Sequence, residues 1–170
     1  MVKKSYPTIP IDEALTVDVE DDVININRSA AVVKGGRRFS FSALAVVGNR
    51  DGLVGIGYGK AKEVPSAVEK SVKDGRKRLM RVLRDGGSIP HQVEGVFCSS
   101  RVRLIPASPG TGIIAGKAVR KVVELAGITD ILTKNYGSTN ALNVVKATMA
   151  ALANLRDQRV VEELRGVKIG

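Results

Sequence analysis

Glycine alternates with larger residues in the strand-like segment Gly55-Ile56-Gly57-Tyr58-Gly59. Successive side chains of a strand point to opposite faces, so these glycines would leave one face almost without side chains. Such a face lets another backbone come close, which predicts that the strand lies against either a helix or a nucleic-acid backbone. The preceding Asn49-Arg50-Asp51-Gly52 is typical of a hairpin turn, because Asp-Gly tolerates the positive φ that such turns require. The segment therefore predicts an antiparallel sheet with a closely packed neighbour.

This glycine pattern does not match a nucleotide-binding loop. A P-loop needs glycine at the position of Val54 and serine or threonine at that of Ala61. A dinucleotide-binding turn needs glycine or alanine where Lys60 stands. Close packing is therefore the better interpretation of these glycines.

Two further strands and a helix complete a first unit. We expect one strand from Val23 to Arg28, leading into the turn Lys34-Gly35-Gly36, and a second over residues 39–47, which alternate with a period of two. Pro65 suits the first turn of a helix and Gly86 suits its end. The predicted buried stripe of that helix is Val68, Val72, Leu79, Val82 and Leu83.

A second unit follows the loop 86–91, the predicted domain boundary. It contains predicted strands at 93–97, 101–106 and 130–133, a helix at 113–126 that Gly127 ends, and a helix at 140–155. The expected organisation is an acidic extended tail (1–22), a first domain (23–86), a second domain (93–155) and a charged tail (156–170). Strands and helices in this order predict an α+β fold.

The positive charge belongs to the folded body. The first 27 residues carry two lysines against six acidic residues, a net charge of −4, whereas the rest carries 25 Lys/Arg against 11 Asp/Glu, a net charge of +14. Such a field attracts polyanions and releases their counterions. The turn Lys34-Gly35-Gly36-Arg37-Arg38 is the sharpest example, because its glycines would let the backbone approach a phosphate that the cations bind.

The predicted helix 65–84 is also lopsided in charge and is expected to face phosphates. Its basic residues are Lys70, Lys73, Arg76, Lys77, Arg78, Arg81 and Arg84. A membrane surface is also anionic, but the chain has no tryptophan and no strongly apolar helix face opposite a basic one, which disfavours membrane binding.

The loop Gly110-Thr111-Gly112-Ile113-Ile114-Ala115 matches the dinucleotide fingerprint Gly-x-Gly-x-x-Ala. No acidic residue stands at the end of a following strand, where that site requires one. We expect instead that the start of the predicted helix, with Ser108, Thr111 and Lys117, holds one anion, from a nucleotide or from RNA.

The sequence offers few residues for disulfides, metal binding or catalysis. A single cysteine and a single histidine exclude a disulfide framework and predict no metal and no cofactor. No nucleophile motif is present, so no enzymatic activity is expected. Cys98 is expected in the core. No apolar run approaches the roughly 20 residues of a membrane span, and a cytoplasmic location is expected.

Five motifs occur in an order that resembles the small-subunit ribosomal protein S5 family, over about residues 23–155. They are Asn27-Arg28 with Val33-Lys34-Gly35-Gly36-Arg37 and Phe39-Ser40-Phe41, then Val54 to Ala61, Glu63-Val64-Pro65, Pro106 to Gly116, and Tyr136-Gly137-Ser138-Thr139-Asn140. The resemblance implies an N-terminal double-stranded-RNA-binding-like domain of three strands and a helix, and a C-terminal S5 domain 2-like α+β domain.

The resemblance also implies a role and partners. The family binds small-subunit, 16S-type rRNA, contacts the ribosomal proteins S4 and S8, and holds the head of the subunit against its body. It contributes to decoding accuracy and lies near the channel through which messenger RNA enters.

Carried over residue by residue, the resemblance implies several sites. The loop 29–37 matches an rRNA-contacting loop beside the spectinomycin site, with Ser29, Ala30, Ala31 and Gly36 adjacent to it. Gly112 and Arg120 match the interface with S4 that is tied to accuracy. The predicted rRNA-binding residues are Arg28, Lys34, Gly35, Gly36, Arg37, Arg38, Arg50, Lys60, Lys62, Ser108, Thr111, Lys117, Tyr136, Ser138 and Thr139.

Overall fold

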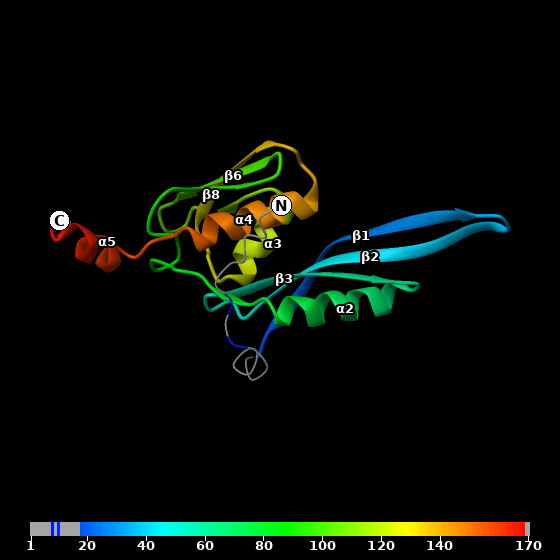
Figure 1. The fold of residues 1–170 in the computed structure, drawn as a ribbon. Coiled ribbons are helices and arrows are strands. Elements are labelled where there is room, and N and C mark those ends of the chain that lie inside the picture. The colour runs from blue at the N-terminus through cyan, green and yellow to red at the C-terminus, as the bar shows by residue number, and fades with distance from the viewer. Residues whose placement is uncertain (1–7, 9, 11–17, 169–170) are drawn as a thin grey trace.

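The computed structural model describes residues 8, 10 and 18–168, so most of the predicted acidic tail lies outside the described residues. The fold is α+β, with two four-stranded sheets (Figure 1). The first sheet has the order β1-β2-β3-β4, and helix α2 packs on it. Its elements are β1 (Glu20–Val33), β2 (Gly36–Gly48), β3 (Leu53–Ala61), α2 (Val64–Arg76) and β4 (Met80–Arg81).

The second sheet has the order β5-β6-β8-β7, with β7 parallel to β8 and the other neighbours antiparallel. Its elements are β5 (Val93–Phe97), β6 (Ser100–Pro106), β7 (Ile113–Ile114), α3 (Lys117–Leu125), β8 (Ile131–Gly137) and α4 (Ala141–Ala153). Helix α5 (Gln158–Arg165) follows, and none of its side chains is buried. No helix within the described residues combines the length and the apolar character needed to cross a bilayer.

The bare face of β3 lies against α2. A Cβ atom at Gly55 would stand 2.5 Å from the carbonyl oxygen of Gly75, and at Gly57 or Gly59 it would overlap the helix backbone. The residues of α2 that are buried against this strand are themselves small: Ala67, Ser71 and Gly75. The sequence left open whether a helix or a nucleic-acid backbone lies against these glycines, and the structure places helix α2 there.

The predicted helix over 65–84 is too long, and part of its predicted buried stripe lies beyond the end of the helix. Helix α2 ends at Arg76, where the amide of Arg78 donates to the carbonyl oxygen of Gly75 at 2.9 Å and turns the chain. Met80 then pairs with Val54 of β3 in a short fourth strand. Leu79 and Val82 are buried, but beyond the helix.

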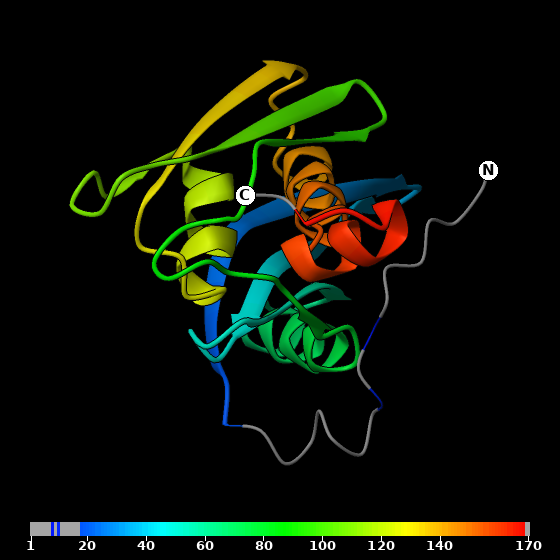
Figure 2. The ribbon, with the colours of Figure 1, turned by 90° about the vertical axis from the view of Figure 1, so that its left-hand side faces the viewer.

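The first sheet is covered on both faces. Ala43, Ala45 and Val47 of β2 are buried, and so are the intervening Leu44 and Val46. Leu44 and Val46 belong to one hydrophobic core together with residues of α3, α4 and the second sheet. The molecule is thus layered in the order α2, first sheet, helices α3 and α4, second sheet, as Figures 1 and 2 show.

Polar contacts join the first sheet to α3 and the residues after it. The amides of Arg50 and Gly52 donate to the carbonyl oxygens of Leu125 and Ala126, each at 3.0 Å. Asp22 of β1 forms an ion pair with Lys121 of α3. This contact gives Asp22 a structural role, and β1 begins at Glu20, within the segment predicted to be a tail.

Helix α3 begins later than expected. Residues 113 and 114 form β7, and the helix starts at Lys117 after its N-cap residue Gly116. The predicted helix over 140–155 matches α4 closely. Asn140 caps α4 by accepting a hydrogen bond from the amide of Leu142 at 3.1 Å.

Candidate nucleic-acid interface

The β1–β2 hairpin extends far beyond the rest of the molecule (Figure 1). Strand β3 pairs with β2 only as far as Phe41, so residues 36–40 of β2 pair with β1 alone. We call residues 25–40 of this hairpin the arm. Its side chains are exposed except at Ser40, which is half-buried. Two strands alone are marginally stable in water, so the arm is suited to lie against a partner.

The predicted phosphate-binding turn is the tip of this arm. Lys34 and Gly35 connect Val33 to Gly36, which are paired across the hairpin, and Gly36 has φ +134°. A Cβ atom at Gly35 or Gly36 would meet nothing within 4 Å, so the backbone here is open to a ligand. Within residues 18–168, Lys34, Arg37 and Arg38 form no ion pair.

The two faces of the arm differ in character. Pairing places Arg28, Ala30 and Val32 opposite Phe41, Phe39 and Arg37, on one face. The guanidinium carbon of Arg28 lies 3.7 Å from the centre of the Phe39 ring, a cation–π contact. On the other face the hydroxyls of Ser29 and Ser40 are 2.9 Å apart.

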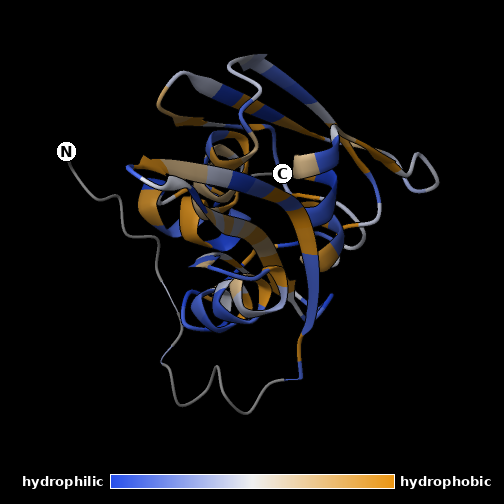
Figure 3. Cartoon of the chain, turned by 90° about the vertical axis from the view of Figure 1, so that its right-hand side faces the viewer, coloured by the Kyte–Doolittle hydropathy of each residue, from blue (hydrophilic) through white to orange (hydrophobic). Residues whose placement is uncertain are grey.

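The arm also exposes apolar side chains that were not predicted as site residues. Val32 is 81% exposed and Phe39 is 40% exposed. Hydrophobic and hydrophilic bands both run along these strands (Figure 3). The alternation of Phe39 with serine and arginine indicated a strand, but it did not reveal that this part of the strand would have no layer packed on it.

The remaining predicted rRNA-binding residues are dispersed. Lys60 and Lys62 are exposed where β3 ends, and Lys117 is exposed where α3 begins. The Nε of Arg50 lies 2.8 Å from a carboxylate oxygen of Glu20, so its charge is partly neutralised within the protein. The set therefore forms several patches around the arm and the second sheet.

Ser138 and Thr139 lie between β8 and α4, with Tyr136 at the end of β8. Ser138 has structural hydrogen bonds, because its carbonyl oxygen accepts from the hydroxyl of Ser100 at 2.6 Å and its hydroxyl accepts from the amide of Asn140 at 3.3 Å. Thr139 and Tyr136 are exposed.

The basic helix face is shorter than predicted. Lys70 and Lys73 are exposed on α2, but Lys77 and the arginines after it lie beyond its end. Arg78 forms an ion pair with Asp74 at 2.9 Å, and Arg84 pairs with Asp51. A guanidinium nitrogen of Arg84 also donates to the carbonyl oxygen of Gly127 at 3.3 Å, so this arginine holds structural contacts.

The loop 108–112 already holds an anion of the protein itself. The amide of Gly112 donates to a carboxylate oxygen of Asp130 at 2.9 Å, and the hydroxyl of Thr129 donates to the other oxygen at 2.8 Å. These hydrogen bonds, the one from Gly112 first, hold the pKa of Asp130 below its usual value. The expectation that the loop opens a helix is wrong, because β7 follows it, and the Gly112 amide is not free for a nucleotide.

Within that loop, Ser108 and Thr111 form a tight turn. The amide and the hydroxyl of Thr111 both donate to the carbonyl oxygen of Ser108, at 3.2 and 2.7 Å. Arg120 lines a pocket of about 420 Å³, together with Arg50, Ile113, Glu124, Gly127, Ile128 and Thr129. Gly112 directly precedes Ile113 in the chain and is not itself part of this lining.

The single histidine contacts the backbone of a distant segment, and the single cysteine is exposed. His91 accepts a hydrogen bond through Nε2 from the amide of Arg156 at 3.0 Å, which ties the start of the C-terminal segment to the loop before β5. Cys98 is exposed in the turn between β5 and β6, so the expectation that it lies in the core is wrong. In the part of the chain that the structure describes, no group of three or more His, Cys, Asp or Glu side chains could hold a metal ion.

Comparison with known proteins agrees with this architecture. Residues 19–83 match the family described as ribosomal protein S5, N-terminal domain, and residues 95–165 match ribosomal protein S5, C-terminal domain. The chain belongs to the ribosomal protein S5 family. It is 53% identical over 156 residues to the small ribosomal subunit protein uS5 of Rhodopirellula baltica, an overlap that covers 92% of this chain and 88% of that relative.

Membership in the ribosomal protein S5 family confirms the resemblance, the α+β fold class and the expectation that the chain is not an enzyme, since the family is structural. The S5 N-terminal match covers β1 to β4, and the C-terminal match covers the second sheet from Gly95 of β5 onward, with α3, α4 and α5. The domain boundaries at 86 and 93 and the individual site residues stay predictions.

Proposed function

We propose that this chain is a structural constituent of the small ribosomal subunit that binds 16S-type rRNA, chiefly through the arm. The observation that carries the proposal is the exposed tip, where Lys34, Arg37 and Arg38 surround two glycines with open space around them. Cations bind phosphate oxygens there, and glycine amides can approach the RNA backbone closely.

The body of the molecule supports a role in fixing RNA segments relative to one another. Its layers share one hydrophobic core, and backbone hydrogen bonds join the first sheet to the end of α3. A rigid body with basic patches on separate elements holds several phosphates at set distances. We infer that this is how the chain holds the head of the subunit against its body.

Finer proposals follow the resemblance. The surface around Gly112 and the pocket lined by Arg120 is proposed as the contact with S4 through which the chain affects decoding accuracy. A contact with S8 and a position near the channel through which messenger RNA enters are proposed as well. The segment of β1 with Ser29, Ala30 and Ala31 is proposed to lie beside the spectinomycin site.

The test replaces the arm arginines one at a time, as Arg37→Ala and Arg38→Ala, in cells that depend on this chain. Both side chains are exposed, so the melting temperature of the purified protein should not change. Mature small subunits should decrease and precursors accumulate on sucrose gradients. Arg159→Ala, which removes an exposed arginine of α5, is the matched control and should leave the profile normal. Normal subunit profiles and normal decoding in both arm variants would refute the proposal.

A further inference from the structure

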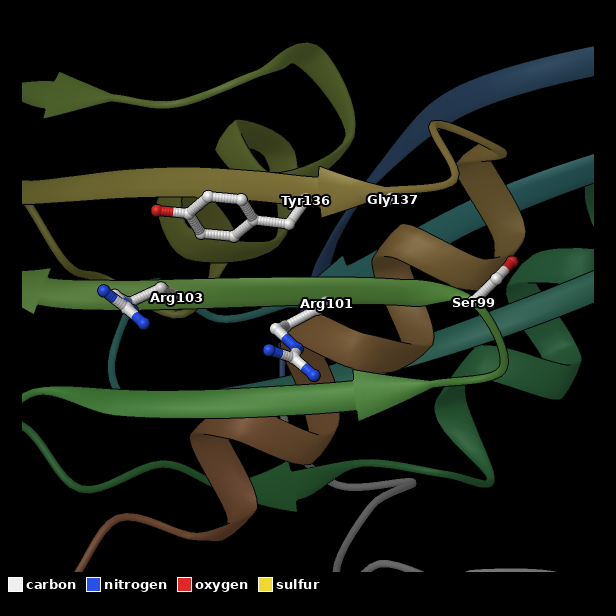
Figure 4. Close-up of a pocket in the computed structure, with 5 residues that line it drawn as sticks. All are labelled: Ser99, Arg101, Arg103, Tyr136 and Gly137. Atoms are coloured by element: carbon white, nitrogen blue, oxygen red, sulfur yellow. The ribbon is translucent and has the colours of Figure 1, made fainter.

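The second sheet has one open face. Helix α4 packs against β5 and β6 on one side, where a Cβ atom at Gly95 would clash with the backbone of Ala147. The opposite side of the sheet is open, and a pocket of about 390 Å³ lies on it. Figure 4 shows its lining residues: Ser99, Arg101, Arg103, Tyr136 and Gly137.

An acidic residue orients both arginines of this pocket. Register places Glu94 of β5 opposite Arg103 of β6. The two carboxylate oxygens of Glu94 bind different arginines, with the Nε of Arg101 at 3.1 Å and an Nη of Arg103 at 3.1 Å. The pairing fixes two long side chains, so less conformational entropy is lost when a ligand binds them.

The ion pair with Glu94 also leaves hydrogen-bond donors of Arg101 available. Arg101 uses its Nε for Glu94, and among residues 18–168 no hydrogen bond engages its two terminal nitrogens. Lys134 stands opposite Arg103 on β8 and is exposed. These three cations against one carboxylate leave the face with a net positive charge.

An aromatic ring stands between these cations. Tyr136 lies opposite Arg101 on the neighbouring strand, and the guanidinium carbon of Arg103 is 5.6 Å from the centre of its ring. Tyr136 is 43% exposed. An exposed ring on an open sheet, flanked by cations, is the arrangement on which proteins stack unpaired bases.

We propose that this face binds an unpaired RNA nucleotide, whose base stacks on Tyr136 and whose phosphate is bound by Arg101 and Arg103. The proposal rests on the proposed rRNA-binding function and adds a second contact surface, distinct from the arm. The net positive charge and the exposed ring favour RNA over a protein partner, which would need to supply an acidic surface here.

The test measures the affinity of the full chain for a fluorescently labelled single-stranded hexa-adenylate by anisotropy. Tyr136→Leu should weaken binding roughly 5- to 150-fold, the range that the loss of one stacked base gives. Tyr136→Phe keeps the ring and should stay within about 2-fold, because stacking does not need the hydroxyl. Thermal melting of each variant confirms that the fold is retained.

Charge is tested separately with Arg101→Gln. Removing one phosphate contact should lower the slope of log affinity against log salt by about 0.7. Arg159→Gln removes the same charge from α5 and should leave the slope unchanged. If Arg159→Gln lowers the slope as much as Arg101→Gln, or if Tyr136→Leu and Tyr136→Phe behave alike, the proposal is overturned.

Ultraviolet cross-linking of assembled subunits distinguishes the remaining outcomes. A cross-link between the Tyr136 peptide and rRNA supports the proposal, whereas a cross-link to another ribosomal protein overturns it and leaves the proposed function standing. If the chain is absent from the small subunits, both the proposed function and this inference fail. Arm variants that impair assembly while Tyr136→Leu has no effect on hexa-adenylate would overturn this inference alone.

Discussion

At the scale of the residue, Gly57 sets the distance between α2 and the first sheet. A Cβ atom at this position would overlap the backbone carbonyl of Ser71, and backbone cannot rotate away as a flexible side chain can. Gly57→Ala should therefore lower the free energy of unfolding by about 3 kcal/mol, as measured by urea denaturation.

Gly35→Ala is the matched control for that change. A Cβ atom at Gly35 would meet nothing within 4 Å, so the same substitution should change the free energy of unfolding by less than about 0.5 kcal/mol. Equal effects of the two substitutions would show that close packing is not what these glycines provide.

Asp130 is the second residue on which a local structure depends. Its lowered pKa means that the carboxylate stabilises the fold at pH values above the unfolded-state pKa of about 3.9, and that this contribution is lost as pH falls through the lower folded-state pKa. Asp130→Asn should therefore be less stable than the wild type at pH 7, with a difference that shrinks below about pH 4. Urea denaturation over a pH series measures this, and a difference that is constant with pH would contradict it.

These residues also show which structural features the sequence could predict and which it could not. The alternation of glycines predicted a closely packed neighbour for β3, and this is confirmed by α2. It could not identify Ala67, Ser71 and Gly75 as the facing residues, because apolar periodicity favoured Val68 and Val72 one position away. The bond from Gly112 to Asp130 spans 18 positions and joins two loops, so no local pattern could predict it.

At the scale of the element, the arm is separable from the fold. Its residues 30–39 pair only within the hairpin, and Ser29 stands opposite Ser40. Replacing 30–39 by Asn-Gly, which favours a two-residue hairpin turn, should change the free energy of unfolding by less than about 1 kcal/mol. The shortened protein should fail to enter small subunits, because the proposed phosphate contacts are gone.

Sucrose-gradient fractions probed for the chain measure that loss. The protein with the full-length arm serves as control. The account of the arm would be wrong if the shortened protein entered subunits as well as this control did.

Element boundaries were predicted well where a local signal decides them and poorly elsewhere. Asn140 caps α4 in the structure, as a helix start signal should. The end of α2 depends instead on Met80 pairing with β3, a contact between distant segments. Basic and apolar residues continue after Arg76 at helical spacing, which is why the predicted helix ran on to Gly86.

At the scale of the whole molecule, the two sheets form one layered body. The sequence predicted two α+β units, but not that Leu44 and Val46 of the first sheet would share a core with Val122 and Val123 of α3. Strand periodicity indicates which residues share a face, and it does not indicate which element covers that face. The placement of the cations follows from this arrangement, since the layers leave the arm and the open face of the second sheet exposed.

The central claim is that this body is an integral rRNA-binding component of the small subunit. Sedimentation of the native protein from a lysate through sucrose, at moderate and at high salt, tests it most directly. We predict co-migration with small subunits at both salt concentrations, because a chain built into the assembled subunit leaves only when all of its contacts break together, whereas a protein held by surface charge alone is released as salt rises. Migration as a free, small species at moderate salt would contradict the claim.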